Sequence, residues 1–268
     1  MKIGTLLITY NEEDYIRYCL KSIKEIVDGV VIIDGGSTDN TLNIITEELG
    51  IDRVIPKNVK ILSDNTRDDY AYLRNLALKE LKGYDWILVL DADEVFANSD
   101  GSPMTREQLE GIINKCEEKK AKAIDFFTRH FIYNYKFIDG RNNGQHFSLS
   151  RLYKNGPNVK YYGLVEAEGM SMHELPVWDA KSLNYPKMQF ANPIIWHFGQ
   201  CKGLEKERRK YAQFLKILQK VHKEKFKDKA PSDDKYDVNE YCKKHELFRM
   251  SRPISFYDGP LPQCLKLW

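Results

Sequence analysis

The chain has 268 residues, of which 30% are charged and 42% hydrophobic, and its formal net charge is only +2. This composition is typical of a soluble globular protein with a sizeable core, and so small a net charge does not argue for nucleic-acid binding. The amino terminus has an apolar run too short for a signal sequence, and no stretch approaches the ~18 apolar residues of a membrane-spanning helix. The 5 cysteines are scattered without C-x-x-C spacing, which is typical of reduced thiols, so we expect a cytoplasmic protein.

Strand and helix patterns alternate through the first hundred residues. Strands are predicted at about 3–9, 30–33, 59–62 and 86–91, and helices at about 13–27, 40–49 and 68–81. Each helical segment repeats apolar residues at helical spacing, which indicates one face packed on a sheet. This alternation predicts an α/β fold with a doubly wound, mainly parallel sheet, because each crossover returns right-handed over one face.

The second half of the chain has a different pattern of predicted elements. Thr105 with Gln108 three residues later predicts a capped helix. Segments rich in aromatic and β-branched residues predict further strands, which would make the sheet mixed, at 123–133, 146–153, 159–165 and 192–198. Residues 166–192 are expected to form an irregular loop.

The last part of the chain predicts a helix and a tail. Residues 205–226 have the apolar stripe of an amphipathic helix, and residues 253–268 are apolar enough to pack as an extended tail. Residues 202–229 carry 11 Lys and Arg against 4 Asp and Glu. This basic segment is either a solvated helix face or a surface for an anionic partner.

Two carboxylates, Asp91 and Asp93, follow the uninterrupted apolar run 86–90. Ligands of open α/β sheets bind at the carboxyl ends of the strands. Residues two apart on an extended chain point to the same side, so this pair suits Mg²⁺ or Mn²⁺. The alternative is an acidic turn that closes a strand.

Polar loops also follow the first two predicted strands, at 9–12 and 34–39. Gly35 and Gly36 are free to take positive φ, and the residues after them are turn formers. Together with Arg74 early in the third helix, these loops are expected to surround one crevice.

At four stretches the sequence resembles the family-2 glycosyltransferases with the A-type fold, such as bacterial sugar transferases of the lipopolysaccharide or capsule type. The matching motifs lie in the expected order at 9–13, 31–41, 73–78 and 86–94, and the resemblance weakens beyond residue 100. It implies a nucleotide-sugar-binding glycosyltransferase domain over 1–200, with a donor half at 1–100 and an acceptor half at 101–200. Residues 201–268 would form a helix and tail packed on it.

The resemblance implies an inverting, metal-dependent transfer of a hexose from a nucleoside diphosphate-sugar, with UDP-sugar favoured, to an acceptor hydroxyl. Asp93 is expected to bind Mn²⁺ or Mg²⁺ directly, Asp91 to touch the ribose or the ion through water, and His197 to be the third ligand. The donor-nucleotide site is expected to comprise Thr9, Tyr10, Asn11, Glu12, Asp34, Ser37, Arg74 and Asp91. The alternative, purely structural roles are helix capping for Asp34, a surface position for Arg74 and a core position for His197.

For the catalytic base, the resemblance points to Glu174, after an arginine strand at 151–153 and an aromatic-Gly pair at 162–163. The His-Glu dipeptide comes later than is usual in the family, which leaves Glu166 and Glu168 as alternatives. Glu174 and Asp93 are therefore the predicted catalytic residues.

The acceptor is open: a glycan, a lipid-linked molecule, a protein or a modified nucleic acid. The basic segment 202–229 adds an anionic surface, including a peripheral site at a membrane, to the expected partners. A non-catalytic sugar-nucleotide-binding protein is the main alternative. A nucleotidyltransferase would need a Gly-rich, Arg-containing loop after the first strand, and residues 9–12 are not one. A receiver-type or phosphohydrolase domain does not explain the loop after the second strand.

Overall fold

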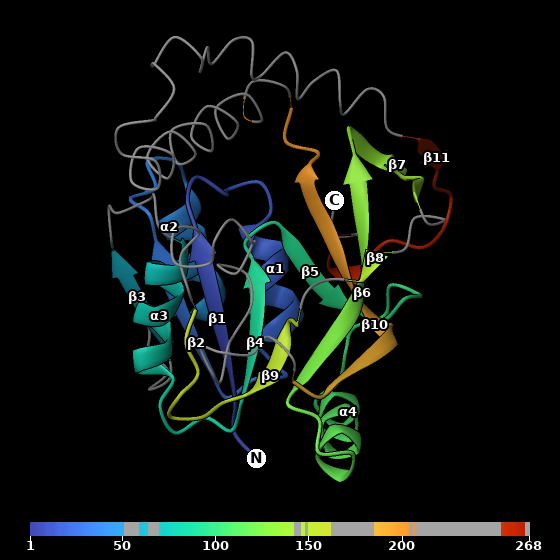
Figure 1. The fold of residues 1–268 in the computed structure, drawn as a ribbon. Helices are drawn as coiled ribbons and strands as arrows, with labels where there is room; N and C mark the ends of the chain where they lie inside the picture. Colours follow the sequence, from blue (N-terminus) through green and yellow to red (C-terminus); the bar gives the residue numbers. More distant parts are fainter. Residues whose placement is uncertain are drawn as a thin grey trace, which may run out of the picture.

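The described residues of the computed structural model form a mixed sheet with helices on both faces (Figure 1). They are residues 1–50, 59–63, 70–141, 146–147, 150–161, 185–203, 206 and 253–265. The first-half elements are β1 (Ile3–Thr9), α1 (Ile16–Ile23), β2 (Gly29–Asp34), α2 (Thr41–Leu49), β3 (Val59–Ser63), α3 (Tyr70–Glu80) and β4 (Trp86–Asp91). The others are β5 (Glu94–Ala97), α4 (Arg106–Glu118), β6 (Ala123–Ile132), β7 (Asn134–Asp139), β8 (His146–Phe147), β9 (Leu152–Lys154), β10 (Lys187–Gln200), β11 (Ile254–Phe256) and a 3₁₀ helix (Gln263–Leu265).

The first half has the predicted topology. β1 pairs in parallel with β2 and β4, and β2 pairs in parallel with β3. The predicted doubly wound α/β class with a mixed sheet is therefore confirmed. α1 begins at Ile16 rather than near residue 13, because the amides of Tyr15 and Ile16 close a turn on the Glu12 carbonyl.

β4 is buried on both faces, as its uninterrupted apolar run predicts. Trp86, Leu88 and Leu90 belong to a core cluster that α1, α2 and α4 share. Ile87 and Val89 belong to a second cluster, with α3 on the opposite face. The helices on the two faces therefore fix the direction of every side chain of β4, and the strand delivers Asp91 to the carboxyl edge.

The second half departs from prediction at several strands. β10 begins at Lys187, so the irregular loop expected over 166–192 is wrong for residues 187–192. β10 pairs in parallel with β6, and the register shifts between Phe190 and Ile194. Residues 159–161 lie in no strand, contrary to the strand predicted at 159–165. The short strands β5, β7 and β11 were not predicted, because strands of three to six residues carry little alternation.

The described part of the tail, residues 253–265, contacts the sheet. β11 pairs antiparallel with β7, and Leu265 lies in a third core cluster with Trp196 and Phe198. The predicted helix 205–226 and most of the basic segment 202–229 lie outside the described residues. In the part of the chain that is described, no helix combines the length and apolar character needed to cross a membrane.

Candidate active site

The loop after β2 is organised by Asp34, which is fully buried. Its carboxylate accepts hydrogen bonds from the amides of Gly36 (2.8 Å) and Ser37 (2.9 Å) and from the Ser37 hydroxyl. Gly36 has a φ of 82°, which side chains rarely adopt. Asp34 therefore caps its own loop rather than the helix that follows, and its contact with a ribose stays a prediction.

The loops after β1 and β2 are bonded into one unit. The Asn11 amide donates to the Ser37 hydroxyl (2.9 Å), and the Asn11 side chain accepts from the Thr38 amide (2.8 Å). Asn11 has a φ of 53°, a conformation that asparagine tolerates better than most residues. The Glu12 amide donates to Thr41 (2.8 Å). These bonds hold Thr9, which is buried, and Tyr10, which is half-buried, at the edge of the sheet.

The two aspartates after β4 have different surroundings. Asp91 ends the strand, and Ala92 and Asp93 form a turn, so the alternation of an extended strand does not reach Asp93. The Asp91 side chain is 40% exposed and forms ion pairs with Arg74 (3.3 Å) and Arg151 (3.4 Å). The Asp93 side chain is only 4% exposed.

Arg74 is a buried residue of α3, so its alternative role as a surface cation is wrong. Its guanidinium lies 5.5 Å from the centre of the Tyr161 ring as well as beside Asp91. The neighbouring Asn75 exchanges two hydrogen bonds with the Tyr161 backbone. Arg74 is thereby held beside Asp91 at the carboxyl edge, and its contact with a donor diphosphate stays a prediction.

Glu94 is a site residue that sequence reasoning missed. It is buried, accepts from the Asp91 amide (2.9 Å) and pairs with Arg151 (2.7 Å). Burial raises the pKa of Glu94 to about 8, although the charge of Arg151 opposes the shift. Glu94 and Arg151 thus hold Asp91 in place. The sequence signal for them was that Glu94 lies in the motif at 86–94 and Arg151 in the strand at 151–153, both part of the family resemblance.

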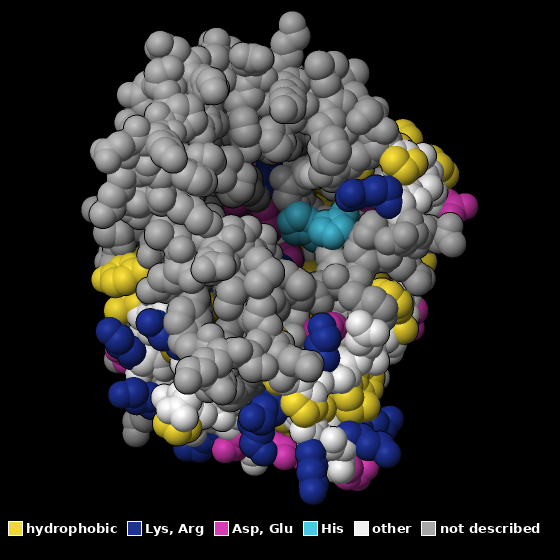
Figure 2. Space-filling view, in the orientation of Figure 1, with side chains coloured by type: hydrophobic (Ala, Val, Ile, Leu, Met, Phe, Trp, Pro, Cys, Tyr) yellow, Lys and Arg dark blue, Asp and Glu magenta, His cyan; other side chains and the backbone are white. Residues whose placement is uncertain are grey.

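His197 comes from β10 and approaches Asp93. The distance from His197 Nε2 to Asp93 Oδ1 is 3.6 Å, and the Phe198 amide donates to the Asp93 carbonyl (2.9 Å). The Nδ1 atoms of His197 and His130 are 2.8 Å apart, so one ring donates to the other. His130, on β6, was not predicted. Figure 2 shows histidine and acidic side chains together in a hollow of this face.

Asp93 and His197 together could hold a cation, and Gly199 places no side chain against either of them. A Cβ atom at Gly199 would lie 2.6 Å from His197 Nε2 and 2.9 Å from Asp93 Oδ2. A carboxylate oxygen and an imidazole nitrogen are suitable ligands for Mn²⁺. No group of three or more His, Cys, Asp or Glu side chains is assembled to hold an ion within the described ranges. Asp91 is turned to its arginines, so its predicted metal role stays a prediction.

Lys202 is a third unpredicted member of the site, after Glu94 and His130. Its side chain is 6% exposed, and its ammonium lies 2.5 Å from Asp93 Oδ2 and 2.6 Å from Glu12 Oε1. The sequence indicated it only as the first cation of a basic segment. The three proposed bases, Glu174, Glu166 and Glu168, lie outside the described residues.

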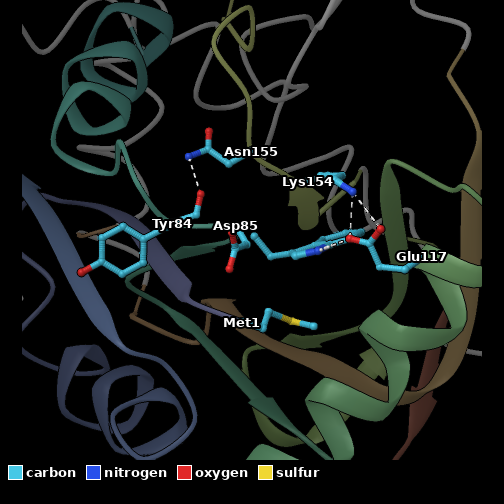
Figure 3. Close-up of a pocket in the computed structure, with 7 residues that line it drawn as sticks. Met1, Tyr84, Asp85, Glu117, Lys154 and Asn155 are labelled. Carbon is cyan, nitrogen blue, oxygen red and sulfur yellow. Dashed lines mark hydrogen bonds and ion pairs between the residues drawn. The ribbon is translucent and has the colours of Figure 1, made fainter.

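A separate pocket of about 360 Å³ lies at the other end of β4 (Figure 3). Its lining includes Asp85, just before that strand, and the ion pair of Lys154 with Glu117 (2.7 Å). This is the amino-terminal edge of the parallel strands, where ligands of open α/β sheets do not bind. The site at the carboxyl edge therefore remains the functional candidate.

The fold and the candidate site define an α/β protein with a cluster of charged side chains at the carboxyl ends of its parallel strands. The chain belongs to glycosyl transferase family 2, whose model matches residues 5–166, more than half of the 268 residues. The predicted family is therefore confirmed.

Two curated relatives illustrate the similarity in sequence. An uncharacterized glycosyltransferase of Rickettsia typhi is 31% identical over 237 residues, which is 80% of this chain and 71% of the relative. The SPbeta prophage-derived glycosyltransferase SunS of Bacillus subtilis is 25% identical over 171 residues, 63% of this chain. The chain spans only 35% of the length of SunS.

Two solved structures resemble most of the chain. Residues 1–349 of S. aureus TarS with UDP-GlcNAc are 14% identical, with a TM-score of 0.46 over 97% of this chain and 98% of that one. The mannosyltransferase PcManGT of Pyrobaculum calidifontis with GDP-Man and Mn²⁺ is 15% identical. The match covers 93% of this chain and 72% of that one, with a TM-score of 0.48.

Proposed function

We propose that this chain is an inverting, metal-dependent hexosyltransferase that uses a nucleoside diphosphate-sugar, with UDP-sugar favoured. The observation that carries the proposal is the approach of His197 Nε2 to within 3.6 Å of Asp93 Oδ1, beside Gly199, which has no side chain to separate them. This pair lies at the carboxyl edge of the sheet, beside the loops of the donor motifs. Membership of glycosyl transferase family 2 supports sugar transfer.

Asp93 and His197 would hold Mn²⁺ or Mg²⁺, with Asp91 as a further ligand through water. When bound, the ion supplies positive charge to the diphosphate leaving group, whose negative charge grows as the C1–O bond breaks. Arg74, held beside Asp91, adds a second positive charge near the same group.

The donor nucleotide is bound by the joined loops after β1 and β2. Tyr10 stacks on the base, and Glu12 and Asp34 accept hydrogen bonds from the base or ribose. Thr9, Asn11 and Ser37 shape this surface, as the hydrogen bonds of Asn11 and Ser37 illustrate.

The transfer is a single displacement. The acceptor oxygen forms a bond to C1 from the face opposite the diphosphate, the C1–O bond to the diphosphate breaks, and the base takes the acceptor proton. We assign the base to Glu174, with Glu166 and Glu168 as alternatives, and a positioned base contributes roughly 10²–10⁴ in rate. The acceptor is a glycan, a lipid-linked molecule or a protein, and the basic segment 202–229 would face an anionic surface, such as the cytoplasmic side of a membrane.

The first experiment is a panel of nucleoside diphosphate-sugars, tested by thermal shift with and without Mn²⁺ and then by donor hydrolysis. A ligand that binds only the folded state raises the melting temperature, so UDP-sugars with Mn²⁺ are expected to give the largest shift. Asp93→Ala should abolish both the Mn²⁺-dependent shift in melting temperature and donor hydrolysis, whereas the exposed Glu118→Ala should change neither.

Unchanged hydrolysis by Asp93→Ala would refute the metal assignment. Binding without hydrolysis or transfer would favour the non-catalytic alternative.

A further inference from the structure

The ammonium of Lys202 bridges two carboxylates from distant parts of the chain. It lies 2.5 Å from Asp93 Oδ2, after β4, and 2.6 Å from Glu12 Oε1, after β1. The side chains are 6%, 4% and 15% exposed for Lys202, Asp93 and Glu12. A buried lysine is stable only when it is paired, and here two carboxylates provide the pairing.

The ammonium binds the carboxylate that a divalent ion would also need. Asp93 directs Oδ1 toward His197 and Oδ2 toward Lys202, so an ion between Asp93 and His197 would share this one carboxylate with the ammonium. A divalent ion and an ammonium on one buried carboxylate would repel each other strongly, because the interior screens charges poorly. The two cations therefore exclude each other from Asp93.

We propose that Lys202 is an internal counter-cation of this site, which neutralises Asp93 and Glu12 when no divalent ion is bound and is displaced when one binds. This inference rests on the proposed function, which places the ion at Asp93. The lysine lowers the apparent affinity for the ion, because only the fraction of molecules with Lys202 displaced is competent to bind it. Displacement also releases Glu12, which lies next to Tyr10, so ion binding is coupled to the nucleotide loop.

The test is calorimetric titration of the full chain with MnCl₂. Lys202→Met removes the competing charge, so we expect Mn²⁺ to bind about tenfold more tightly. Lys202→Arg keeps the charge and can bind both carboxylates, so it should bind Mn²⁺ no more tightly than the unaltered chain. Lys206→Met is the matched control and should match the unaltered chain: Lys206 is also a paired lysine, 2.6 Å from Asp14, but it is 38% exposed and does not touch Asp93.

Circular dichroism and thermal unfolding establish that each variant is folded. Without metal, Lys202→Met should have a lower melting temperature than the unaltered chain, since two buried carboxylates lose an ammonium. Added Mn²⁺ should reduce this difference in melting temperature. Equal or weaker Mn²⁺ binding by folded Lys202→Met, in a chain that otherwise binds Mn²⁺, would overturn the counter-cation proposal alone. If neither the unaltered chain nor Lys202→Met bound Mn²⁺, the metal site of the proposed function would fall, and this inference with it.

Discussion

At the scale of single residues, the site depends on a glycine, Gly199, as much as on charged side chains. Gly199 follows the β10 residues His197 and Phe198, and its φ is not in the positive region. The backbone there would accept alanine, so the need for glycine comes from the neighbouring His197 and Asp93 side chains. A sequence pattern cannot reveal this, because the contact exists only after β10 and the β4–β5 turn are brought together.

Gly199→Ala is expected to weaken Mn²⁺ binding about tenfold or more, because its Cβ would lie 2.6 Å from His197 Nε2 and 2.9 Å from Asp93 Oδ2 and would push both ligands out of place. Calorimetric titration with MnCl₂ measures the effect. Gly111→Ala is the matched control: nothing lies within 4 Å of the added methyl group in α4, so Mn²⁺ binding should stay the same. Undiminished Mn²⁺ binding by Gly199→Ala would contradict the placement of the ion between Asp93 and His197.

At the scale of elements, α4 shows how much local sequence can determine. The Thr105 hydroxyl accepts from the Gln108 amide (3.2 Å), and the Gln108 side chain accepts from the Thr105 amide (2.9 Å). This is the capping box predicted from two residues three apart. It was predictable because every partner lies within one helical turn. The beginning of β10, in contrast, depends on pairing with β6, more than 60 residues earlier in the chain.

Thr105→Ala is expected to lower the free energy of unfolding by about 1 kcal/mol, since the first turn of α4 loses its side-chain acceptor. The melting temperature should fall by roughly 2–4 °C. Thermal unfolding measures this, with the exposed Glu118→Ala, in the last turn of α4, as the control. Donor hydrolysis should not change, because α4 lies away from the carboxyl ends of β1 and β4 (Figure 1). A loss of activity at full stability would contradict this placement.

At the scale of the whole molecule, β9 connects the two halves of the sheet. Leu152 pairs with Leu88 of β4 on one side and with Ile124 of β6 on the other, antiparallel to both. It is fully buried in a core cluster that also contains Ile3 and Ile195, from the two halves of the chain. A strand of only three residues therefore makes the sheet continuous.

Leu152→Ala should lower the free energy of unfolding by roughly 2–5 kcal/mol, because it leaves a cavity at this junction. The half-buried Leu42→Ala should cost less. Urea unfolding can be followed by far-UV circular dichroism and by the fluorescence of the 4 tryptophans, which include Trp86 in the first half and Trp196 in the second. We expect both probes to give the same midpoint, since one core cluster spans the halves. Separate transitions would show that the halves unfold independently.

The sequence by itself determined the family, the α/β class, the order of the first-half elements and the loops that approach the carboxyl edge. These features follow from apolar periodicity, turn-forming residues and motifs of adjacent residues, so they are readable locally. Only the tertiary structure decided that Asp91 turns to arginines while Asp93 meets His197 and Lys202. The physical reason is that charge pairing in a buried site depends on distances between residues that lie 17 to 109 positions apart in the chain.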